Sequence, residues 1–548
     1  MKIIKFCKRF FLNHKKCYFE YLSLILVSWI VSITIPYLSG KYIDLLVSIK
    51  DKLDIYFYTK AILVIGVIGC FSSYFKSIVY EKIYSRSVNG INLYLIEHIR
   101  KLPLSFFRNT NSVYLVQRIR MDSSELIYFS ISEVINLIIK IFTCLTSFVI
   151  MFKLNYKVAS ILLIVIPIYI VIYKLFGQRL YSCRHNYIEK DNSYVASLNQ
   201  QINNIQFIKL NSLYSYMNTK IRVIFEDFFS YIMKLIRVNS LYENISDCVD
   251  SIANVILFLY GGLEIYNGNL TVGEFTIMNL YFNMAFASIQ YFVKFGGIYQ
   301  RVLVSYNRVI EILQIPNENN GTIVLNQINN IKLENIEFSY SEKQKIIANF
   351  NYYFEKGKIY CLKGLNGSGK STLIKLMLGI EQNYKGNILF DGVKLEDIDM
   401  YELRNNKIGI TEQEPTLLND TLRSNLILNN NKLIKDEKII NYCNELGLNS
   451  LTKNFSNGLD TILDENNTNI SGGEKQKISI IKTLLKDPDV LILDEPTSAL
   501  DENSIKKLEN ILLSLKKNKI IIIISHNDSI LDFANNVIDI NRDVFTNI

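Results

Sequence analysis

The chain has 548 residues, of which 49% are hydrophobic and only 20% are charged, and its mean hydropathy is +0.16. This balance excludes an ordinary soluble enzyme, because soluble domains carry about 25% charged residues. Residues 331–548 contain 27 Lys and Arg against 31 Asp and Glu, whereas the first 330 residues contain 33 against 20. The chain therefore divides into a basic, apolar part and a nearly neutral part. Its eight scattered cysteines form no CxxC pair and no cluster with zinc-site spacing, which excludes a disulfide scaffold.

Six segments of the apolar part are long enough to cross a bilayer, which takes about 20 mostly apolar residues. We expect these spans at Glu20–Tyr42, Tyr58–Lys82, Phe129–Phe152, Val158–Leu175, Asp247–Tyr266 and Glu274–Gly297. An even number of spans returns the chain to its starting side. The connections after the second and fourth spans are about 45 and about 70 residues long and keep helical periodicity, so we expect their helices to continue far beyond the bilayer.

The positions of Lys and Arg predict the orientation of the spans, because cytoplasmic segments carry an excess of both. Six basic residues precede the first span, six lie between Arg86 and Arg120, and eight lie between Arg179 and Arg237. We therefore expect both termini and residues 331–548 in the cytoplasm, in a multi-pass protein of the cytoplasmic (inner) membrane. The basic N-terminus lacks the cleavage site of a signal peptide, so we expect it to be retained. Since the same rule explains the basic charge, we expect no nucleic-acid partner.

Two of the spans carry polar side chains on one face at 100° per residue. The third span has Glu133, Asn136, Lys140, Thr143 and Ser147, and the sixth has Asn279, Asn283, Gln290, Lys294 and Arg301. Such faces are not expected to meet lipid, where an ionisable group costs at least a few kcal/mol. One interpretation is polar packing between helices, with the long basic side chains reaching the headgroups. The other is a water-filled cavity for a substrate.

A phosphate-binding loop is the most specific motif in the chain. The apolar residues Ile359–Leu362 lead into Gly364-Leu365-Asn366-Gly367-Ser368-Gly369-Lys370-Ser371-Thr372, and a helical segment follows. This is the GxxxxGK[ST] pattern in the strand-loop-helix setting that it requires. The glycines let backbone N–H groups surround phosphate oxygens, Lys370 would reach the β and γ phosphates, and the Ser371 hydroxyl would bind Mg²⁺. The alternative is a structural glycine-rich turn, which the motifs that follow disfavour.

A pair of acidic residues follows a second apolar strand, Val490–Leu493. Asp494 is placed to hold Mg²⁺ through water, and Glu495 is placed to accept a proton from the water that attacks the γ phosphate. A plain strand end is the alternative. It becomes less probable once the phosphate loop is present.

Between these motifs stands Ile470-Ser471-Gly472-Gly473-Glu474, and Ser498-Ala499-Leu500-Asp501 follows the acidic pair. With these segments the chain resembles the ATP-binding cassette family, whose motifs occur in this order and at this spacing. The resemblance implies that the Ser-Gly-Gly segment of one nucleotide domain closes onto ATP held by the phosphate loop of another. It therefore implies a dimer with two composite ATP sites.

The same resemblance assigns further single residues. Tyr340 resembles the aromatic residue that stacks on adenine, with a plain core aromatic as the alternative. Gln413 resembles the glutamine that contacts Mg²⁺ and the attacking water, and His526 resembles the histidine that contacts the γ phosphate. Glu465 matches an acidic residue near the opposite coupling helix of exporters.

Together these assignments give the expected site. The residues expected to bind ATP are Tyr340, Gly364, Asn366, Gly367, Ser368, Gly369, Lys370, Ser371, Thr372, Gln413, Ser471, Gly472, Gly473, Glu474, Asp501 and His526. The residues expected to act in catalysis are Glu495, His526, Gln413 and Lys370. The residues expected to hold Mg²⁺ are Ser371, Gln413 and Asp494.

The apolar part resembles the membrane domain of exporters in the same family. This implies an α-helical six-span transmembrane domain at 1–315, a linker at 316–330 and an α/β phosphate-loop ATPase domain of the ATP-binding cassette type at 331–548. By the same analogy, coupling helices lie around Asn109–Val116 and Asn211–Met217.

Three features depart from the family pattern. Glu474 replaces the glutamine that is common after Ser-Gly-Gly, and Lys477 is the basic residue that follows. The chain ends about twenty residues after His526, where relatives usually have about forty more. No room remains before the first span for a cysteine-protease domain, so a leader-cleaving peptide exporter is not expected.

These observations predict an ATP-driven exporter that works as a homodimer, with a heterodimer as the alternative. The polar stripes favour a polar or amphipathic cargo, such as a matured antimicrobial peptide, over hydrophobic drug or lipid efflux. A membrane-linked regulatory ATPase and an importer are further alternatives, because the ATP motifs would serve them equally.

Overall fold

The computed structural model describes residues 2–48, 52–108, 110, 112–340, 345–428, 434–448, 458–463, 470–525 and 528–540. The chain forms two compact units. The first consists of Met1–Arg100 and Ser112–Ile315, and the second of Lys101–Asn111 and Pro316–Ile548. The second unit therefore includes a short segment that the sequence places inside the membrane domain.

Within its described residues, the regular secondary structure of the first unit is all helical. Its elements are α1 (Lys2–Phe11), η1 (Leu12–His14), α2 (Lys15–Val47), α3 (Lys52–Ile99), α5 (Ser112–Tyr128), the π-helical turn η2 (Phe129–Glu133), α6 (Val134–Leu154), α7 (Tyr156–Asn203), α8 (Ile205–Leu210), α9 (Tyr214–Tyr266) and α10 (Val272–Gln314). The six predicted spans fall on α2, α3, η2 with α6, α7, α9 and α10. Among the residues that the structure describes, four helical stretches qualify as spans by length and apolar composition, and they include α2, α3, α6 and α9. The full count of six stays a prediction.

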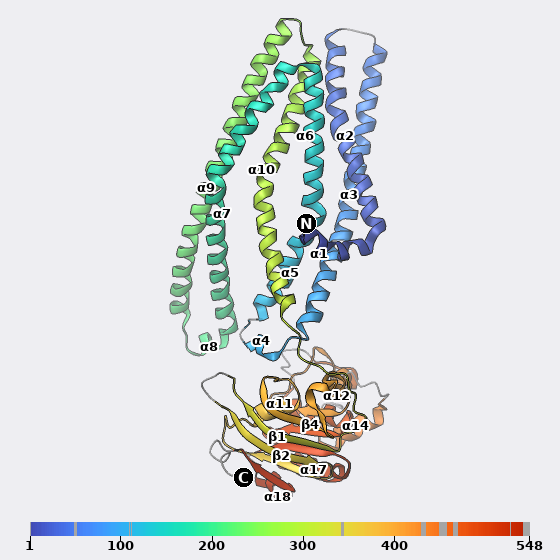
Figure 1. The fold of residues 1–548 in the computed structure, drawn as a ribbon, viewed down its shortest axis with the longest axis vertical. Helices are drawn as coiled ribbons and strands as arrows, with labels where there is room; N and C mark the ends of the chain where they lie inside the picture. Colours follow the sequence, from blue (N-terminus) through green and yellow to red (C-terminus); the bar gives the residue numbers. More distant parts are fainter. Residues whose placement is uncertain are drawn as a thin grey trace. The chain divides into compact units, whose positions relative to one another are not determined.

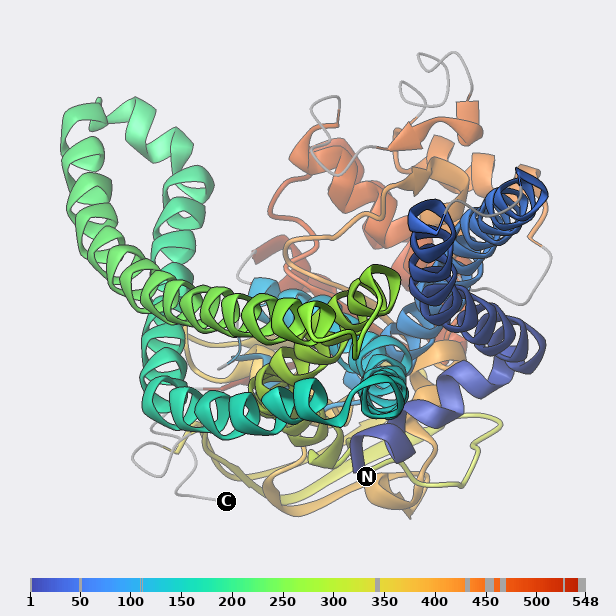
Figure 2. The same cartoon turned by 90° about the horizontal axis from the view of Figure 1, so that it is seen from above.

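Three of these helices are much longer than a bilayer is thick. Helices α3 and α7 have 48 residues each and α9 has 53, so each is at least about 70 Å long at 1.5 Å per residue. This confirms that helical structure continues beyond the predicted spans. Helices α7 and α9 lie side by side and are joined by α8 (Figure 1). Figure 2 shows α6 and α10 between this pair and the pair formed by α2 and α3.

The C-terminal part of α2 and the N-terminal end of α10 approach each other closely. A Cβ atom on Gly40 would overlap the carbonyl oxygen of Gly273, and a Cβ on Gly273 would overlap that of Gly40. The Asp44 carboxylate accepts hydrogen bonds from the backbone N–H of Gly273 (2.7 Å) and the hydroxyl of Thr271 (2.8 Å). Thr271 also forms a capping box with Glu274 at the start of α10. The small residues thus allow the contact, and the polar ones fix its position.

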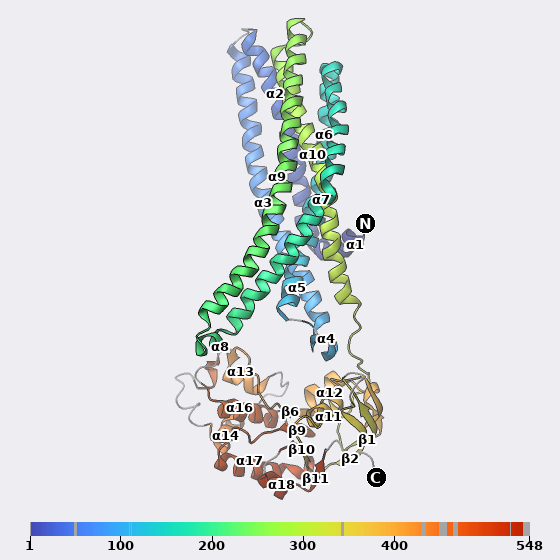
Figure 3. The same ribbon diagram turned by 90° about the vertical axis from the view of Figure 1, so that its left-hand side faces the viewer.

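The second unit is built on two main sheets. Its described elements are α4 (Leu104–Arg108), β1 (Asn330–Phe338), β2 (Ile347–Glu355), β3 (Ile359–Lys363), α11 (Lys370–Met377), β4 (Tyr384–Phe390), β5 (Val393–Lys394), η3 (Leu395–Asp397), α12 (Met400–Asn406), β6 (Ile408–Thr411), β7 (Asp420–Thr421), α13 (Leu422–Ile427), α14 (Asp436–Glu445), η4 (Gly458–Asp460), β8 (Ile462–Leu463), α16 (Gly472–Leu485), β9 (Val490–Asp494), α17 (Glu502–Leu515), η5 (Lys516–Asn518), β10 (Ile520–Ile524), α18 (Asp528–Phe533) and β11 (Asn536–Asp539). An antiparallel sheet has the order β2-β1-β4-β5, and a parallel sheet has the order β11-β3-β10-β9-β6. Figure 3 shows β6, β9 and β10 side by side.

The central strands of the parallel sheet are buried on both faces. In β3, Ile359 and Cys361 pack into one hydrophobic cluster, whereas Tyr360 and Leu362 pack into the other. The five consecutive isoleucines of β10 alternate between the two clusters in the same way. This explains why these strands are continuous apolar runs in the sequence. It also confirms the strands predicted at 359–362 and 490–493.

The segment predicted as a linker belongs to the second unit and packs against other residues of it. The backbone N–H of Gly321 donates to the carbonyl of Ile398 (2.9 Å), Ile323 forms a β-bridge with Ile398, and Ile328 is fully buried. The domain boundaries at 316 and 331 stay predictions.

The two predicted coupling segments lie at different kinds of helix connection. In the first, α4 ends at Arg108 and α5 begins at Ser112, while Asn109 and Asn111 lie outside the described residues. Residues 211–217 cover the turn between α8 and α9. The coupling role of both segments stays a prediction.

Candidate nucleotide site and membrane cavity

The phosphate loop joins β3 to α11, as the motif predicts. Gly364, Gly367 and Gly369 have φ angles of 156°, 79° and 105°, which side chains with a Cβ rarely adopt. A Cβ on Gly364 would also lie 2.5 Å from the carbonyl oxygen of Ile540. The turn around Asn366 therefore needs these glycines, and it ends at the N-terminus of α11.

Two buried polar groups of this loop, the Lys370 ammonium and the Ser368 hydroxyl, are hydrogen-bond donors that could bind an anion. Lys370 is 7% exposed, and its ammonium donates to the carbonyl oxygens of Gly364 (2.6 Å) and Leu365 (3.0 Å). Burial lowers the pKa of this ammonium. The Ser368 hydroxyl is also buried and, within the described part of the chain, has no hydrogen-bond partner. A buried polar atom without a partner is costly, and a phosphate oxygen would satisfy it.

The carboxylate of Asp494 lies next to Ser371 at the end of β9. The Ser371 hydroxyl donates to Asp494 Oδ2 at 3.3 Å. Burial is the main cause that raises the pKa of Asp494, and the nearby Glu495 adds to it. A hydroxyl beside a desolvated carboxylate is an oxygen-rich arrangement that fits Mg²⁺.

Gln413 and Glu495 also meet at this edge of the sheet. Strand β6 ends at Thr411 and pairs with β9, so the residues that follow each strand come together. The amide of Gln413 donates to Glu495 Oε2 at 2.9 Å. Glu495 has a φ of 45°, an uncommon left-handed conformation for a residue that is not glycine. Such strain at a carboxyl edge is typical of a functional position.

The Ser-Gly-Gly segment starts helix α16. Ser471 is its N-cap and forms a capping box with Glu474, whose carboxylate accepts from the backbone N–H and the hydroxyl of Ser471 (both 2.8 Å). Gly472 follows at the first turn. A Cβ on Gly473 would lie 2.5 Å from the carbonyl oxygen of Ala499, so a larger residue would not fit. The substituted Glu474 therefore has a structural role in the capping box.

Asp501 links this helix to α17. It accepts hydrogen bonds from the hydroxyl of Ser504 (2.5 Å) and the ammonium of Lys477 (3.2 Å), and together they lower the pKa of Asp501 to about 2. Lys477, one of the departures from the family pattern, thus has a carboxylate partner.

Tyr340 lies just after β1, close to the phosphate loop. Its hydroxyl is 3.1 Å from the hydroxyl of Thr372, and its ring meets Phe338 edge-to-face with centroids 4.8 Å apart. The side chain is 43% exposed, which disfavours a plain core role. Two further neighbours are not predicted by any motif. The Arg108 guanidinium lies 4.1 Å from the ring centroid of Tyr340 and pairs with Glu381.

Two predicted residues cannot be placed. His526 and Glu465 both lie outside the described residues. The serine before the histidine, Ser525, is buried after β10, next to β9 in the sheet.

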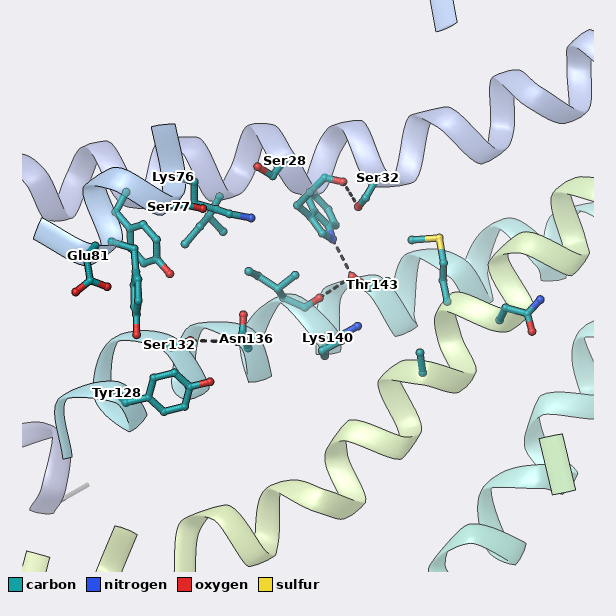
Figure 4. Close-up of a pocket in the computed structure, with 18 of the residues that line it drawn as sticks. Ser28, Ser32, Lys76, Ser77, Glu81, Tyr128, Ser132, Asn136, Lys140 and Thr143 are labelled. Atoms are coloured by element: carbon teal, nitrogen blue, oxygen red, sulfur yellow. Dashed lines mark hydrogen bonds between the residues drawn. The ribbon is translucent and has the colours of Figure 1, made fainter. Parts of the chain in front are cut away.

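The first unit contains a cavity of about 880 Å³ (Figure 4). Its walls come from α2, α3, the α5–α6 region and α10, and they combine aromatic rings with charged and amide groups. Lys76, Glu81 and Lys140 supply charges, and Asn136 and Asn283 supply amides. Trp29 and Thr143 both line the cavity, and the indole N–H of Trp29 donates to the Thr143 hydroxyl at 3.0 Å. The cavity is therefore amphipathic.

In each of the two predicted polar stripes, some residues line the cavity and others form polar contacts between helices. From the third span, Asn136, Lys140 and Thr143 line the cavity, whereas Glu133 is buried and accepts a hydrogen bond from Tyr291 (2.6 Å). From the sixth span, Asn283 lines it. Gln290, two turns further on the same face, instead donates to the hydroxyl of Tyr169 on α7 (3.3 Å). One stripe thus meets different helices along its length.

Comparisons with known proteins agree with the two-part architecture. A family model described as "ABC transporter transmembrane region" matches residues 18–289, and one described as "ABC transporter" matches residues 347–498. The ATP-dependent lipid A-core flippase of Syntrophus aciditrophicus (strain SB) is 27% identical over 475 residues, which cover 86% of this chain and 78% of the flippase. The flippase of the same name from Desulfotalea psychrophila (strain LSv54 / DSM 12343) is 25% identical over 544 residues, covering 96% and 94%.

A solved structure supports the same fold. It is the structure of a bacterial Atm1-family ABC exporter with ATP bound, which matches with a TM-score of 0.82 at 18% identity. The match covers 96% of this chain and 93% of that one. An α-helical membrane domain followed by an α/β ATPase domain is therefore the fold of this chain.

Proposed function

Since the chain belongs to the ATP-binding cassette transporter family, we propose that it is an ATP-driven exporter of an amphipathic cargo. The observation that carries the ATP-driven part is the meeting of three motifs at one edge of the parallel sheet. The phosphate loop follows β3 there and leads into α11, whose first turn carries Ser371. Asp494 ends β9 and bonds Ser371, while Glu495 just after β9 bonds Gln413 just after β6. Ligands of open parallel sheets bind at this carboxyl edge.

Each residue has a task in ATP hydrolysis. Lys370 exchanges its two loop carbonyls for the β and γ phosphate oxygens, and the Ser368 hydroxyl donates to another phosphate oxygen. Tyr340 stacks on the adenine ring. Glu495 accepts a proton from the attacking water, and Gln413 orients that water from the neighbouring strand. His526 is proposed for the γ phosphate from the sequence alone.

Mg²⁺ is the proposed cofactor, held by Ser371 and by Asp494 through water, with Gln413 as a further ligand. When bound, it would neutralise charge on the β and γ phosphates. The half-buried Asp494 carboxylate and the Ser371 hydroxyl provide the oxygens for it.

A second copy of the chain completes the ATP site in this proposal. Ser471, Gly472 and Gly473 sit at the N-terminus of a 14-residue helix, where backbone N–H groups favour an anion. They would contact ATP held by the phosphate loop of the partner. A homodimer gives two such sites, and a related half-transporter is the alternative partner. We place this dimer in the cytoplasmic membrane with both termini inside, following the basic segments.

The cavity in the first unit supports the proposed cargo class. Its charged and amide groups suit a polar headgroup or peptide backbone, while Trp29, Tyr21 and Tyr80 offer apolar surface. A polar or amphipathic peptide could contact both the polar groups and the apolar surface of this cavity. The names of the flippase relatives favour a second candidate, a lipid with a large polar headgroup. The charged walls disfavour a small hydrophobic drug.

ATP-dependent uptake into inside-out membrane vesicles tests the proposal. The vesicles receive fractionated extracts of the source cell, one with its peptides and one with its lipids, and mass spectrometry compares wild type with Glu495→Gln. We expect accumulation only with wild type and ATP, and the active fraction identifies the cargo class. Active ATPase without accumulation of any compound would contradict export and favour a regulatory ATPase or an importer.

A further inference from the structure

Helix α4 contributes one side chain to the surroundings of Tyr340. The segment Lys101–Asn111 belongs to the second unit although it connects α3 to α5 in sequence. At the end of α4, the guanidinium carbon of Arg108 lies 4.1 Å from the centroid of the Tyr340 ring. This is the distance and geometry of a cation–π contact.

Arg108 is held in this place by a second contact. Its guanidinium pairs with the carboxylate of Glu381, which is only 5% exposed. A buried carboxylate needs a partner of opposite charge, so this pair fixes the guanidinium next to the ring.

The ring of Tyr340 has little freedom to turn away from Arg108. Its hydroxyl is tied to Thr372 at the start of α11, and Phe338 packs against it edge-to-face at an interplanar angle of 89°. A purine stacks on an aromatic ring at nearly the same separation as the guanidinium has here. The guanidinium therefore covers one face of the ring, a surface on which a base can stack.

We propose that Arg108 competes with the purine base for the ring of Tyr340, so that base binding releases α4 from this contact. The inference rests on the proposed role of Tyr340 in stacking on adenine. Only a few residues separate α4 from α3 before it and from α5 after it. The exchange therefore reports the state of the nucleotide site to these two helices of the first unit. By linkage, whatever strengthens the Arg108–Tyr340 contact weakens base binding by the same factor.

The substitutions separate the ring contact from the ion pair. Arg108→Lys keeps a positive charge for Glu381 but loses the planar group that stacks. Arg108→Ala removes both contacts. Each should tighten ATP binding, by about three- to tenfold for the loss of a contact of this kind. Binding of inorganic triphosphate, which has no base, should stay unchanged.

Isothermal titration calorimetry on the full chain in detergent measures both ligands with Mg²⁺. All variants carry Glu495→Gln, so that ATP is not hydrolysed during the titration. In the background of Tyr340→Ala, the Arg108 substitutions should lose their effect on ATP, because no ring remains to compete for. Equal or weaker ATP binding by both Arg108 variants would overturn the inference, as would an equal gain for inorganic triphosphate.

The proposed nucleotide site can fail independently. If Tyr340→Ala alone leaves ATP binding unchanged, the adenine assignment is wrong and the inference falls with it. If Tyr340→Ala weakens ATP but not triphosphate, while the Arg108 variants do not tighten ATP, only the competition is wrong.

Discussion

Asp494 is a half-buried carboxylate whose position serves ligand binding at a cost in stability. Burial raises its pKa above the usual value, Glu495 adds to the effect, and Ser371 and Lys370 oppose it. The folded protein therefore binds this proton more tightly than the unfolded chain does. The resulting penalty is present at pH values above the raised pKa and disappears as the pH falls toward the ordinary pKa.

Asp494→Asn should for this reason stabilise the nucleotide-free protein at neutral pH. A gain of about 1 kcal/mol is typical for removing a functional strain, and it corresponds to about 2–4 °C in the midpoint of thermal unfolding. The measurement is thermal unfolding in EDTA at pH 7 and again at acid pH. We expect the difference between variant and wild type to shrink as the pH falls, while ATPase activity is lost throughout. A lower midpoint for the variant at pH 7 would contradict the argument.

Single residues also mark the limit of what sequence motifs predict. The phosphate loop and Asp494 were predictable, because each follows an apolar strand and the chemistry needs neighbours close in sequence. The contact of Arg108 with Tyr340 was not, because 232 positions separate the two residues and no pattern surrounds Arg108. Only the three-dimensional structure brings such residues together.

At the scale of whole helices, small residues decide how closely α2 and α10 pack. A methyl group on Gly40 would overlap the backbone of Gly273 and the side chain of Ile277, whereas one on Gly262 of α9 would meet no atom within 4 Å. We expect Gly40→Ala to destabilise the protein by about 1–3 kcal/mol, the usual cost of overpacking. Gly262→Ala is the matched control and should be neutral or slightly stabilising, since Ala favours helix.

Thermal unfolding of both glycine variants in the same detergent measures this difference. Equal midpoints of thermal unfolding for the two variants would show that the close contact between α2 and α10 does not contribute to stability.

Helix α10 shows why periodicity alone cannot assign a polar face. Asn283 and Gln290 lie seven residues apart and so on one face, yet Asn283 lines the cavity and Gln290 bonds Tyr169 of α7. An ideal 100° period states which residues share a face, but the neighbour of that face changes along a long helix. The polar stripes were predicted from the sequence, and their partners could not be.

This division of α10 predicts different effects of two equivalent substitutions. Asn283→Leu removes an amide from the cavity wall and should raise the cargo concentration for half-maximal ATPase stimulation about tenfold, as for one lost polar contact. Gln290→Leu is the control and should change it by less than about twofold, because Tyr169 keeps its hydrogen bond to Ser246 (2.8 Å). Equal shifts in both variants would mean that the cavity does not bind the cargo.

At the scale of the whole molecule, the helical membrane domain and the α/β ATPase fold followed from local patterns of hydropathy and motif order. The inclusion of Lys101–Asn111 in the second unit did not, because it depends on tertiary contacts of a short segment between two long helices. The dimer, too, is an inference from motif chemistry. It rests on Ser471 and Lys370 acting on the same ATP from different chains.

Composite sites make a prediction that separate sites do not share. Lys370→Ala disables the phosphate loop, and Ser471→Arg disables the segment that would press on the partner's ATP. A dimer of either variant alone has two defective sites. A mixed dimer carries both defects in one site and leaves the other intact, if each site draws on both chains.

Co-expression with two different affinity tags isolates these mixed dimers for an ATPase assay. We expect them to recover up to about half of the wild-type rate, since one of two sites is whole, while each parent variant stays inactive. If each chain instead built its own site, both sites of the mixed dimer would be defective and no activity would return. Recovered activity would therefore mean that the intact site comes from two chains, because neither variant alone contains both a working Lys370 and a working Ser471.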